Sequence, residues 1–350
     1  MKILITGGCG FIGSAVVRHA IRAGHEIVNI DKMTYAASRE ALEQALPHPR
    51  HMLVEADICD AAAMRAAFAA HRPDAVMHLA AESHVDRSID GPADFIHTNI
   101  TGTFTLLEAA RDYYGTLTSE KRGKFRFHHI STDEVFGALA DADPAFNENT
   151  PYDPRSPYSA SKAASDHLAR AWMHTYGLPV IVSNTTNNYG PWQFPEKLIP
   201  LTLINAIEEK PLPVYGQGLN TRDWLYVEDH AEALLKVVLE GAPGATYCIG
   251  AKQPRRNIDV VRAICAIIDE KLPSPHGARA RLIAYVTDRP GHDYRYEIDP
   301  ATAETALHWQ AAHDFERGLR ATAEWYLANA AWWQGIRAQK YAGQRLGGTK

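Results

Sequence analysis

The sequence predicts an α/β fold built around a doubly wound parallel sheet. Over residues 1–188, short runs rich in β-branched residues alternate with longer stretches of helical apolar spacing, which is typical of parallel strands joined by crossover helices. A glycine-rich loop follows the first run directly, and several prolines break the alternation after Tyr189. These observations predict one α/β domain at residues 1–188 and a second, smaller domain after it.

The elements of the first domain follow in chain order. Strands are expected at residues 2–6, 26–30, 51–55, 75–79, 125–131 and 180–184, and helices at 12–23, 60–71 and 99–114. Another helix should start at Pro157, because Ser156 suits the N-cap and proline suits the first helical position. Gly177 should end that helix.

The residues after Tyr189 predict a smaller, discontinuous α/β substrate domain. Asp229 is expected to cap a helix over the run AEALLKVVL, and residues 245–250 predict one more strand, so that residues 222–252 return to the first domain. The second domain then comprises residues 189–221 and 253–335. Residues 336–350 are glycine-rich and basic without apolar periodicity, which predicts a flexible tail.

Composition excludes several classes of protein. The 350 residues are 46% hydrophobic and 22% charged, which allows a large core and argues against disorder. The net charge of -5 is spread without a cationic stripe, so no nucleic-acid partner is expected. No apolar run is long enough for a membrane span or a signal peptide, and the four cysteines and the histidines lack metal-ligand spacing. We therefore expect a cytoplasmic protein with no membrane partner and no metal.

The loop GGCGFIG after the first expected strand predicts a dinucleotide site of the Rossmann type. Gly7, Gly10 and Gly13 allow a tight turn and let the backbone approach a pyrophosphate at the N-terminus of the next helix. Asp31, at the end of the next strand, can accept hydrogen bonds from ribose hydroxyls and would repel a 2′-phosphate, which favours NAD over NADP, although the adjacent Lys32 acts in the opposite sense. The pair Asp57 and Ile58 suits either an adenine contact or a helix cap.

Two further motifs carry candidate catalytic groups. Tyr158 and Lys162 are four residues apart on one helix face, where the lysine charge should lower the pKa of the phenol so that it can accept a hydroxyl proton. Thr132, Asp133 and Glu134 follow an expected strand at its carboxyl end, where ligands of open parallel sheets bind. Both acids reach one ligand only if a turn redirects them, because successive side chains of a strand point to opposite sides.

The chain resembles the nucleotide-sugar 4,6-dehydratases of the extended short-chain dehydrogenase/reductase family over nearly its full length. The shared motifs are GGCGFIG, LAAESHVDRSI at 79–89, TNITGTFTLLEAAR at 98–111, STDEVFG at 131–137, YSASK at 158–162, NNYGPWQFPEKLIPL at 187–201, RDWLYVEDHA at 222–231 and DRPGHDYRYEID at 288–299. The acidic pair in STDEVFG separates these dehydratases from the related epimerases. The chain departs from the family at Thr185, Thr186 and Phe136, and segments 116–125 and 253–257 leave the preferred base open.

The resemblance implies an oxidation, elimination and reduction on one hexose. It assigns Tyr158 as the base for the C4 hydroxyl, with Thr132 bonding the same oxygen and Lys162 assisting, Glu134 as the base at C5, and protonated Asp133 as the acid for the leaving C6 hydroxyl. Tightly bound NAD would be recycled. The resemblance also implies a homodimer packed through helices that include the Tyr158 helix, and a role in deoxysugar biosynthesis.

The resemblance further implies two sets of binding residues. NAD would contact Gly7, Gly10, Phe11, Ile12, Gly13, Asp31, Lys32, Thr34, Asp57, Ile58, Leu79, Ala80, Ala81, Ser83, Thr98, Tyr158, Lys162 and Asn188. The substrate, dTDP-glucose, would contact Ser83, Thr132, Asn187, Lys197, Leu198, Pro213, Tyr215, Arg222, Asn257, Arg289 and His292. The alternatives are a dehydratase of UDP-glucose or another nucleotide hexose, a UDP-hexose 4-epimerase, and a non-catalytic NAD-binding regulator.

Overall fold

The computed structural model describes residues 1–343 and 346, and its largest feature is a seven-stranded, all-parallel sheet. The strand order is β10-β6-β5-β4-β1-β2-β3, so the chain winds from β1 to one edge and then from β4 to the other, which confirms the predicted doubly wound sheet. The strands are β1 (Lys2–Thr6), β2 (Glu26–Asp31), β3 (His51–Glu55), β4 (Ala75–His78), β5 (Arg126–Thr132), β6 (Val180–Thr185) and β10 (Thr246–Ile249). We call this sheet and the helices packed on it the first lobe.

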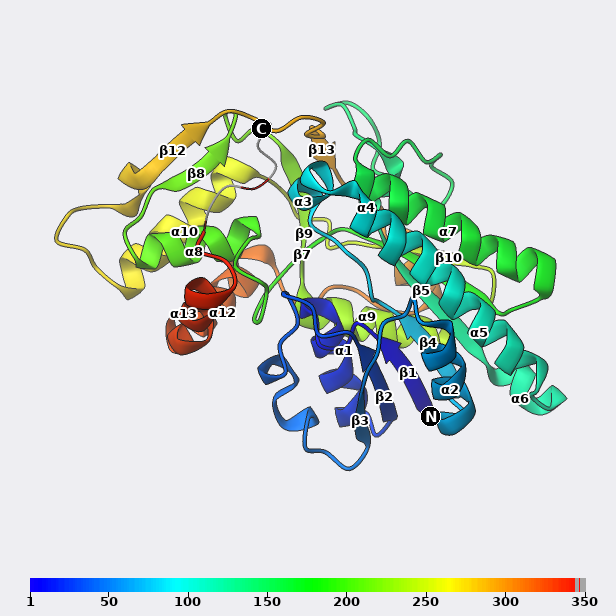
Figure 1. Ribbon diagram of the computed structural model, residues 1–350. Helices are drawn as coiled ribbons and strands as arrows, with labels where there is room; N and C mark the ends of the chain where they lie inside the picture. The colour runs from blue at the N-terminus through cyan, green and yellow to red at the C-terminus, as the bar shows by residue number, and fades with distance from the viewer. Residues whose placement is uncertain (344–345, 347–350) are drawn as a thin grey trace.

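Helices cover both faces of the sheet (Figure 1). Helices α1 and α9 pack together on one face, whereas α2, α5 and α7 lie on the other. Ile3 and Ile5 of β1 belong to the core on the α1 side and Leu4 to the core on the α5 side, because successive side chains of a strand alternate. The helices of the first lobe are α1 (Phe11–Arg22), α2 (Ala61–His71), α3 (Val85–Asp90), α4 (Pro92–Phe95), α5 (Thr103–Gly115), α6 (Ser119–Lys124), α7 (Pro157–Tyr176), α9 (Val227–Glu240) and α11 (Ala301–Ala306), with a π-helix at Ile96–Gly102 and 3-10 turns at Glu40–Ala45 and Asp133–Phe136.

The start of α7 matches its prediction, but two other helix starts do not. Ser156 caps α7 through its side chain, and Gly177 ends the helix in the left-handed conformation. Helical structure expected from residue 99 already begins at Pro92, because α4, the π-helix and α5 follow one another without a gap; the short α3 precedes them and ends at Gly91, whose backbone is not helical. The prediction that Asp229 caps α9 is wrong: Tyr226 is the N-cap, and Asp229 lies in the first turn, where it accepts hydrogen bonds from the backbone N and Nδ1 of His313 at 2.8 and 2.7 Å.

A second lobe, with an apolar core of its own, lies beside the first lobe. Its main sheet has the order β11-β9-β13, with β7 also paired to β9, and β8 and β12 form a two-stranded sheet. The strands are β7 (Asn187–Tyr189), β8 (Leu212–Tyr215), β9 (Thr221–Tyr226), β11 (Pro254–Arg256), β12 (Ile283–Val286) and β13 (Arg295–Tyr296). The helices are α8 (Leu198–Ile207), α10 (Asn257–Lys271), α12 (Phe315–Ala328) and α13 (Ala330–Gln339), with a 3-10 turn at Arg279–Leu282.

The chain passes between the two lobes more often than the predicted domain ranges allow. Strand β9 pairs within the second lobe, so the return to the first lobe begins with α9 rather than at residue 222. Helix α11 packs against β10, which places part of the predicted range 253–335 on the first lobe. The division into two domains therefore stays a prediction, with these differences in its boundaries.

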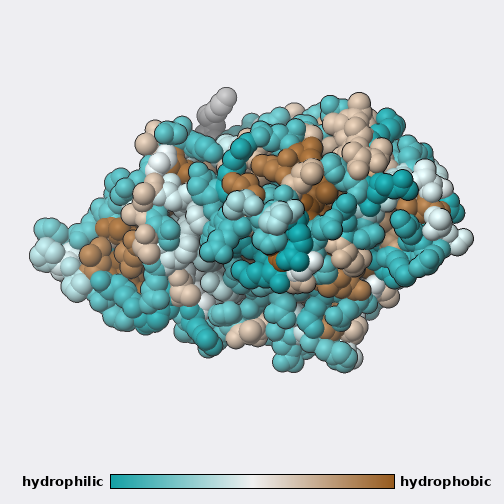
Figure 2. Space-filling view, turned by 90° about the horizontal axis from the view of Figure 1, so that it is seen from below, coloured by the Kyte–Doolittle hydropathy of each residue, from teal (hydrophilic) through white to brown (hydrophobic). Residues whose placement is uncertain are grey.

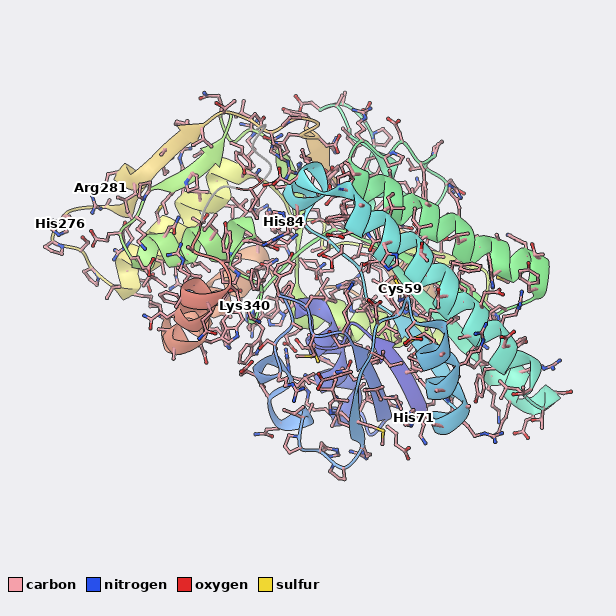
Figure 3. All side chains as sticks on the ribbon, in the orientation of Figure 1. Cys59, His71, His84, His276, Arg281 and Lys340 are labelled. Atoms are coloured by element: carbon pink, nitrogen blue, oxygen red, sulfur yellow. The ribbon has the colours of Figure 1, made fainter. Side chains whose placement is uncertain are left out.

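The predicted tail at 336–350 is helical where it begins. Helix α13 continues to Gln339 because Trp333 buries its ring in the second-lobe core, and Tyr341 is buried as well. Lys340, labelled in Figure 3, donates a hydrogen bond from Nζ to the carbonyl oxygen of Tyr35 at 3.2 Å and so joins this end to the first lobe. Residues 344, 345 and 347–350 of the predicted tail lie outside the described residues.

Four further features of the described residues concern the surface, membrane spans, metal sites and cysteines. On the face shown in Figure 2, hydrophilic residues dominate and apolar residues form separate patches. Within residues 1–343 and 346, no helix is long and apolar enough to cross a membrane, and no group of three histidine, cysteine or acidic side chains is placed to hold a metal ion. All four cysteines are free thiols.

Candidate active site

A cavity lies at the carboxyl ends of the central strands, where the sheet changes direction between β1 and β4, and the segment 185–197 leading into the second lobe supplies another wall. This cavity brings together most of the predicted site residues. Those lining it are Gly7, Gly10, Phe11, Ile12, Gly13, Asp31, Lys32, Thr34, Ile58, Leu79, Ala80, Ala81, Ser83, Thr98, Thr132, Glu134, Tyr158, Lys162, Asn187, Asn188 and Lys197. Residues from both lobes therefore surround one space.

The glycine loop forms a cradle that side chains would fill. Gly7 has a φ of +75°, and a Cβ added there would lie 2.7 Å from the backbone N of Ala80. A Cβ on Gly13 would lie 2.1 Å from the carbonyl oxygen of Gly7. Gly10 caps α1 without a side-chain hydrogen bond, so the N–H groups and the positive end of that helix face the cavity. These features fit the pyrophosphate of the predicted dinucleotide.

Replacing Gly13 with alanine is expected to weaken NAD binding about tenfold or more, because the added methyl group forces the loop backbone to move. The measurement is the NAD content of the purified protein together with a calorimetric titration of NAD. Gly123→Ala is the matched control, since a Cβ there meets no atom within 4 Å. Equal NAD affinity in the two variants would contradict the role assigned to the cradle.

Asp31 fixes the glycine loop as well as facing the cavity. Its Oδ2 accepts a hydrogen bond from the backbone N of Cys9 at 2.9 Å, and its Oδ1 accepts one from the backbone N of Met33 at 2.8 Å. Burial raises the pKa of Asp31, and these two hydrogen bonds lower it. The aspartate is therefore held in place at the end of β2.

Only one of the two residues predicted to contact the adenine of the cofactor lies at the cavity. Ile58 lines the cavity, whereas Asp57 lies outside the lining. Asp57 Oδ1 accepts from the backbone N of Cys59 at 2.9 Å, and its Oδ2 lies 3.6 Å from Lys32 Nζ. Asp60, not Asp57, caps α2.

The acidic motif sits on a turn that redirects its two carboxyl groups, as the sequence requires. Strand β5 ends at Thr132, whose Oγ1 accepts from the backbone N of Glu134 at 3.2 Å and thereby caps the 3-10 turn. Glu134 lines the cavity and is partly exposed there, whereas Asp133 is 1% exposed and lies outside the lining. The two neighbouring acids thus occupy different environments.

The pKa of both acids is raised above its ordinary value, but different charges act on the two groups. Burial, and then the negative charge of Glu134, raise the pKa of Asp133 to about 8, against a hydrogen bond with Thr186. Burial also raises the pKa of Glu134, while the positive charges of Arg289, Arg222 and Lys197 lower it. At neutral pH, Asp133 is a neutral acid that can donate a proton.

Tyr158 and Lys162 both line the cavity, but their electrostatics differ from the sequence prediction. Burial and the charge of Glu134 raise the pKa of Tyr158, and a hydrogen bond with Thr132 lowers it. Lys162 Nζ donates to the carbonyl oxygen of Ile130 at 2.8 Å, and burial lowers the pKa of this lysine to about 8. The cost of burying a phenolate outweighs the lysine charge in the free protein.

The remaining predicted substrate residues lie outside the cavity lining, on the second lobe. Tyr215 OH and Arg289 Nη1 both donate to Asp86 of the first lobe, at 3.1 and 2.7 Å, and the Tyr215 ring lies 6.1 Å from that of His292. Arg222 stacks over the Tyr296 ring at 4.1 Å. The others are Leu198 at the start of α8, Pro213 on β8 and Asn257 at the start of α10. The structure therefore brings Tyr215, Arg289 and His292 together.

The sequence did not identify two buried acids at the site, Glu196 in the cavity lining and Asp86 outside it. Glu196 is buried and accepts hydrogen bonds from Tyr35 OH at 2.9 Å and Arg87 Nε at 2.8 Å, which joins three separate chain segments. Asp86 pairs with two predicted substrate residues. Both acids stand inside conspicuous motifs, next to Lys197 and within LAAESHVDRSI, but a carboxylate among positive charges is also typical of an exposed surface. Their burial alone distinguishes them.

Comparisons with known proteins agree over the whole chain. A family model described as GDP-mannose 4,6 dehydratase matches residues 4–322. The dTDP-glucose 4,6-dehydratase of Neisseria meningitidis serogroup B is 57% identical over 353 residues, covering 100% of this chain and 99% of that protein. The dTDP-glucose 4,6-dehydratase 1 of Escherichia coli K12 is 58% identical over 350 residues and 97% of each chain. The crystal structure of the dTDP-glucose 4,6-dehydratase DesIV from Streptomyces venezuelae, solved with NAD bound, superposes with a TM-score of 0.88 at 38% identity, covering 96% of this chain and 100% of that one.

Proposed function

The chain belongs to the GDP-mannose 4,6 dehydratase family, and from this premise we propose that it acts as a dTDP-glucose 4,6-dehydratase. It is an NAD-dependent hydro-lyase that converts dTDP-glucose to dTDP-4-keto-6-deoxyglucose and water. The observation that carries this proposal is the acidic turn at the end of β5: Glu134 lines the cavity that also holds Tyr158, and Asp133 lies buried next to Glu134 with a raised pKa. An acid and a base at one site are what an elimination of water requires.

The first step is oxidation of the sugar at C4. Tyr158 accepts the proton of the C4 hydroxyl, and Thr132 holds the same oxygen through a hydrogen bond. Tyr158 must be a phenolate to accept this proton and becomes a phenol when it does so. Lys162 stands one helical turn from Tyr158, where its positive charge favours the phenolate form. The glycine cradle and Asp31 would hold NAD, which would supply a reversible hydride acceptor for C4 and so would not be consumed overall.

The second step removes water and gives the product. The C4 carbonyl acidifies the hydrogen at C5, so Glu134 takes this proton while Asp133 gives its own proton to the leaving C6 hydroxyl. The hydride is then returned to C6 and a proton to C5. Three positively charged side chains act on Glu134: those of Lys197, Arg222 and Arg289. They are suited to bind the diphosphate of the substrate, because their N–H donors match phosphate oxygens.

The test is mass spectrometry and proton NMR of dTDP-glucose incubated with the purified protein without added NAD. We expect the loss of one water and a new C6 methyl signal. A product of unchanged mass would indicate an epimerase. Turnover of UDP-glucose but not dTDP-glucose would assign a different base, and no turnover of either sugar after NAD is supplied would overturn the proposal.

The pH dependence follows from the pKa of Asp133. Because that pKa is raised to about 8, the acid is protonated below this pH and loses its proton above it. We expect the rate of water loss to fall as pH rises through about 8, measured by single-turnover quench flow and mass spectrometry. A rate of water loss that stays constant to pH 10, roughly two units above that pKa, would contradict the acid role.

We also propose a homodimer in the cytoplasm. Phe104 of α5 and Tyr176 at the end of α7 are 44% and 48% exposed, which leaves an apolar face available where the resemblance implies the contact. Sedimentation velocity of the wild type and of Phe104→Glu tests the dimer.

The free cysteines are in keeping with a reducing compartment, and fractionation of cells expressing the native gene tests the location.

A further inference from the structure

Asp166 continues the face of α7 that carries Tyr158 and Lys162. The three residues are four positions apart, so they lie one above another along the helix. Asp166 is 0% exposed and does not line the cavity. A buried carboxylate is costly unless hydrogen bonds compensate the loss of water, so its surroundings should be organised around its charge.

Four side chains donate hydrogen bonds to this carboxylate. Oδ1 accepts from His129 Nε2 at 3.0 Å, and Oδ2 accepts from Ser131 Oγ at 2.8 Å, from Tyr152 OH at 2.8 Å and from Asn184 Nδ2 at 3.3 Å. Burial raises the pKa of Asp166, but the hydrogen bond and electrostatic interaction with His129, the charge of Lys162 and the hydrogen bond from Ser131 outweigh burial and bring the pKa below its ordinary value. The group is therefore an ionised carboxylate inside the protein.

Asp166 accepts hydrogen bonds from the residues on either side of Ile130, whose carbonyl oxygen accepts a hydrogen bond from Lys162. His129 and Ser131 both reach Asp166 because alternate residues of β5 point to the same side. Ile130 lies between them, and its carbonyl oxygen is the acceptor for Lys162 Nζ. Asn184 also donates to the carbonyl oxygen of Thr132 at 3.1 Å, where the acidic turn begins. One carboxylate thus fastens both the lysine acceptor and the start of the turn to α7.

The charge of Asp166 acts on Lys162 as well. Burial lowers the pKa of Lys162, and the Asp166 charge raises it. The other titratable groups around Asp166 are His129 on β5, Tyr152 in the preceding loop and Arg170 on α7, whose Nη2 donates to Tyr152 OH at 3.0 Å. Burial keeps the pKa of His129, and of His78 packed 5.3 Å from it, below the ordinary value, so both rings are neutral at neutral pH. Among the groups that interact with Asp166, Lys162 is then the one whose pKa lies at about 8.

We propose that Asp166 is a positioning residue for the reaction: its buried carboxylate fastens the end of β5 to α7 and keeps Lys162 as an ammonium beside Tyr158. The inference rests on the proposed function, because it assigns Lys162 its role in C4 oxidation. Asp166 touches neither the cavity nor the substrate, so its effect reaches the chemistry only through Lys162 and the strand end.

The experiment is the pH profile of NADH formation in a single turnover, measured on the NAD-loaded wild type and on Asp166→Asn. We expect Asp166→Asn to lower the rate about 10- to 100-fold, which is typical of losing an outer hydrogen-bonding partner. The alkaline limb should move down by about one pH unit or more, because the lysine loses its counter-charge. The KM for dTDP-glucose should stay unchanged. An unmoved alkaline limb would overturn the inference.

Tyr152→Phe is the matched control, since it removes one hydrogen bond to Asp166, leaves the charge in place and lies outside the cavity lining. It should slow NADH formation several-fold with the alkaline limb unmoved. If Asp166→Asn does not fold, as judged by circular dichroism, Tyr152→Phe carries the test, and a wild-type rate in it would overturn the inference. If the wild type itself does not convert dTDP-glucose, the proposed function fails, and the pH dependence of NAD affinity in wild type and Asp166→Asn then decides the inference, with identical profiles overturning it.

Discussion

Replacing Tyr158 with phenylalanine is expected to lower the rate of NADH formation in a single turnover about 10³- to 10⁴-fold. Tyr158, as its phenolate, is the group that accepts the C4 proton. Among the cavity-lining residues that the structure describes, it is the tyrosine that lies on the same helix face as Lys162. Without that acceptor, the hydride cannot leave C4. Stopped-flow absorbance of NADH measures the rate.

The design of this test separates chemistry from folding. Phenylalanine keeps the ring that packs edge-on against Phe95 at a centroid distance of 6.3 Å, so the apolar contact survives. Tyr176→Phe is the matched control, because Tyr176 ends the same helix and is 48% exposed. NADH formation at the wild-type rate in Tyr158→Phe would remove Tyr158 from the role of base.

Replacing Glu134 with glutamine is expected to abolish exchange of the C5 hydrogen with solvent deuterium and to slow overall turnover about 10²- to 10³-fold. The amide cannot accept the C5 proton, whereas C4 oxidation needs only Tyr158 and its neighbours. NADH should therefore accumulate in a single turnover. Proton NMR in deuterium oxide and the absorbance of NADH measure the two steps on one sample.

The neighbouring acid provides the comparison for Glu134→Gln. In Asp133→Asn, exchange at C5 should persist while water loss slows, because this variant lacks the proton for the C6 hydroxyl but keeps the base. Exchange that continues unchanged in Glu134→Gln would assign the base to another group. The pair of variants thus distinguishes the two acids, although they are adjacent in the sequence.

Periodicity predicts the first lobe well and the second lobe poorly, for a physical reason. Strands β1, β2, β4, β5 and β6 are buried over nearly their whole length, so each carries its own apolar signal. Strands β11 and β13 have only three and two residues, and they exist because they pair with β9 from distant parts of the chain. No local pattern records such a pairing.

The candidate site follows the same division. The glycine loop, the acidic turn and the tyrosine and lysine of α7 are predictable because each motif lies within a few consecutive residues. The pKa of Tyr158 was predicted in the wrong direction, because burial depends on the whole fold. Asp166 continues the four-residue spacing of Tyr158 and Lys162, and that spacing could have identified it. Asp86 and Glu196 gave no comparable signal.

The position of β10 at the edge of the large sheet bears on how the chain folds during synthesis. Strand β10 pairs with β6, yet strands β7 to β9 of the second lobe lie between them in the sequence. The backbone edge of β6, an apolar strand, therefore stays unpaired on the growing chain until those strands have been made. The large sheet is completed only after three strands of the second lobe have been synthesised, so the two lobes cannot fold strictly one after the other.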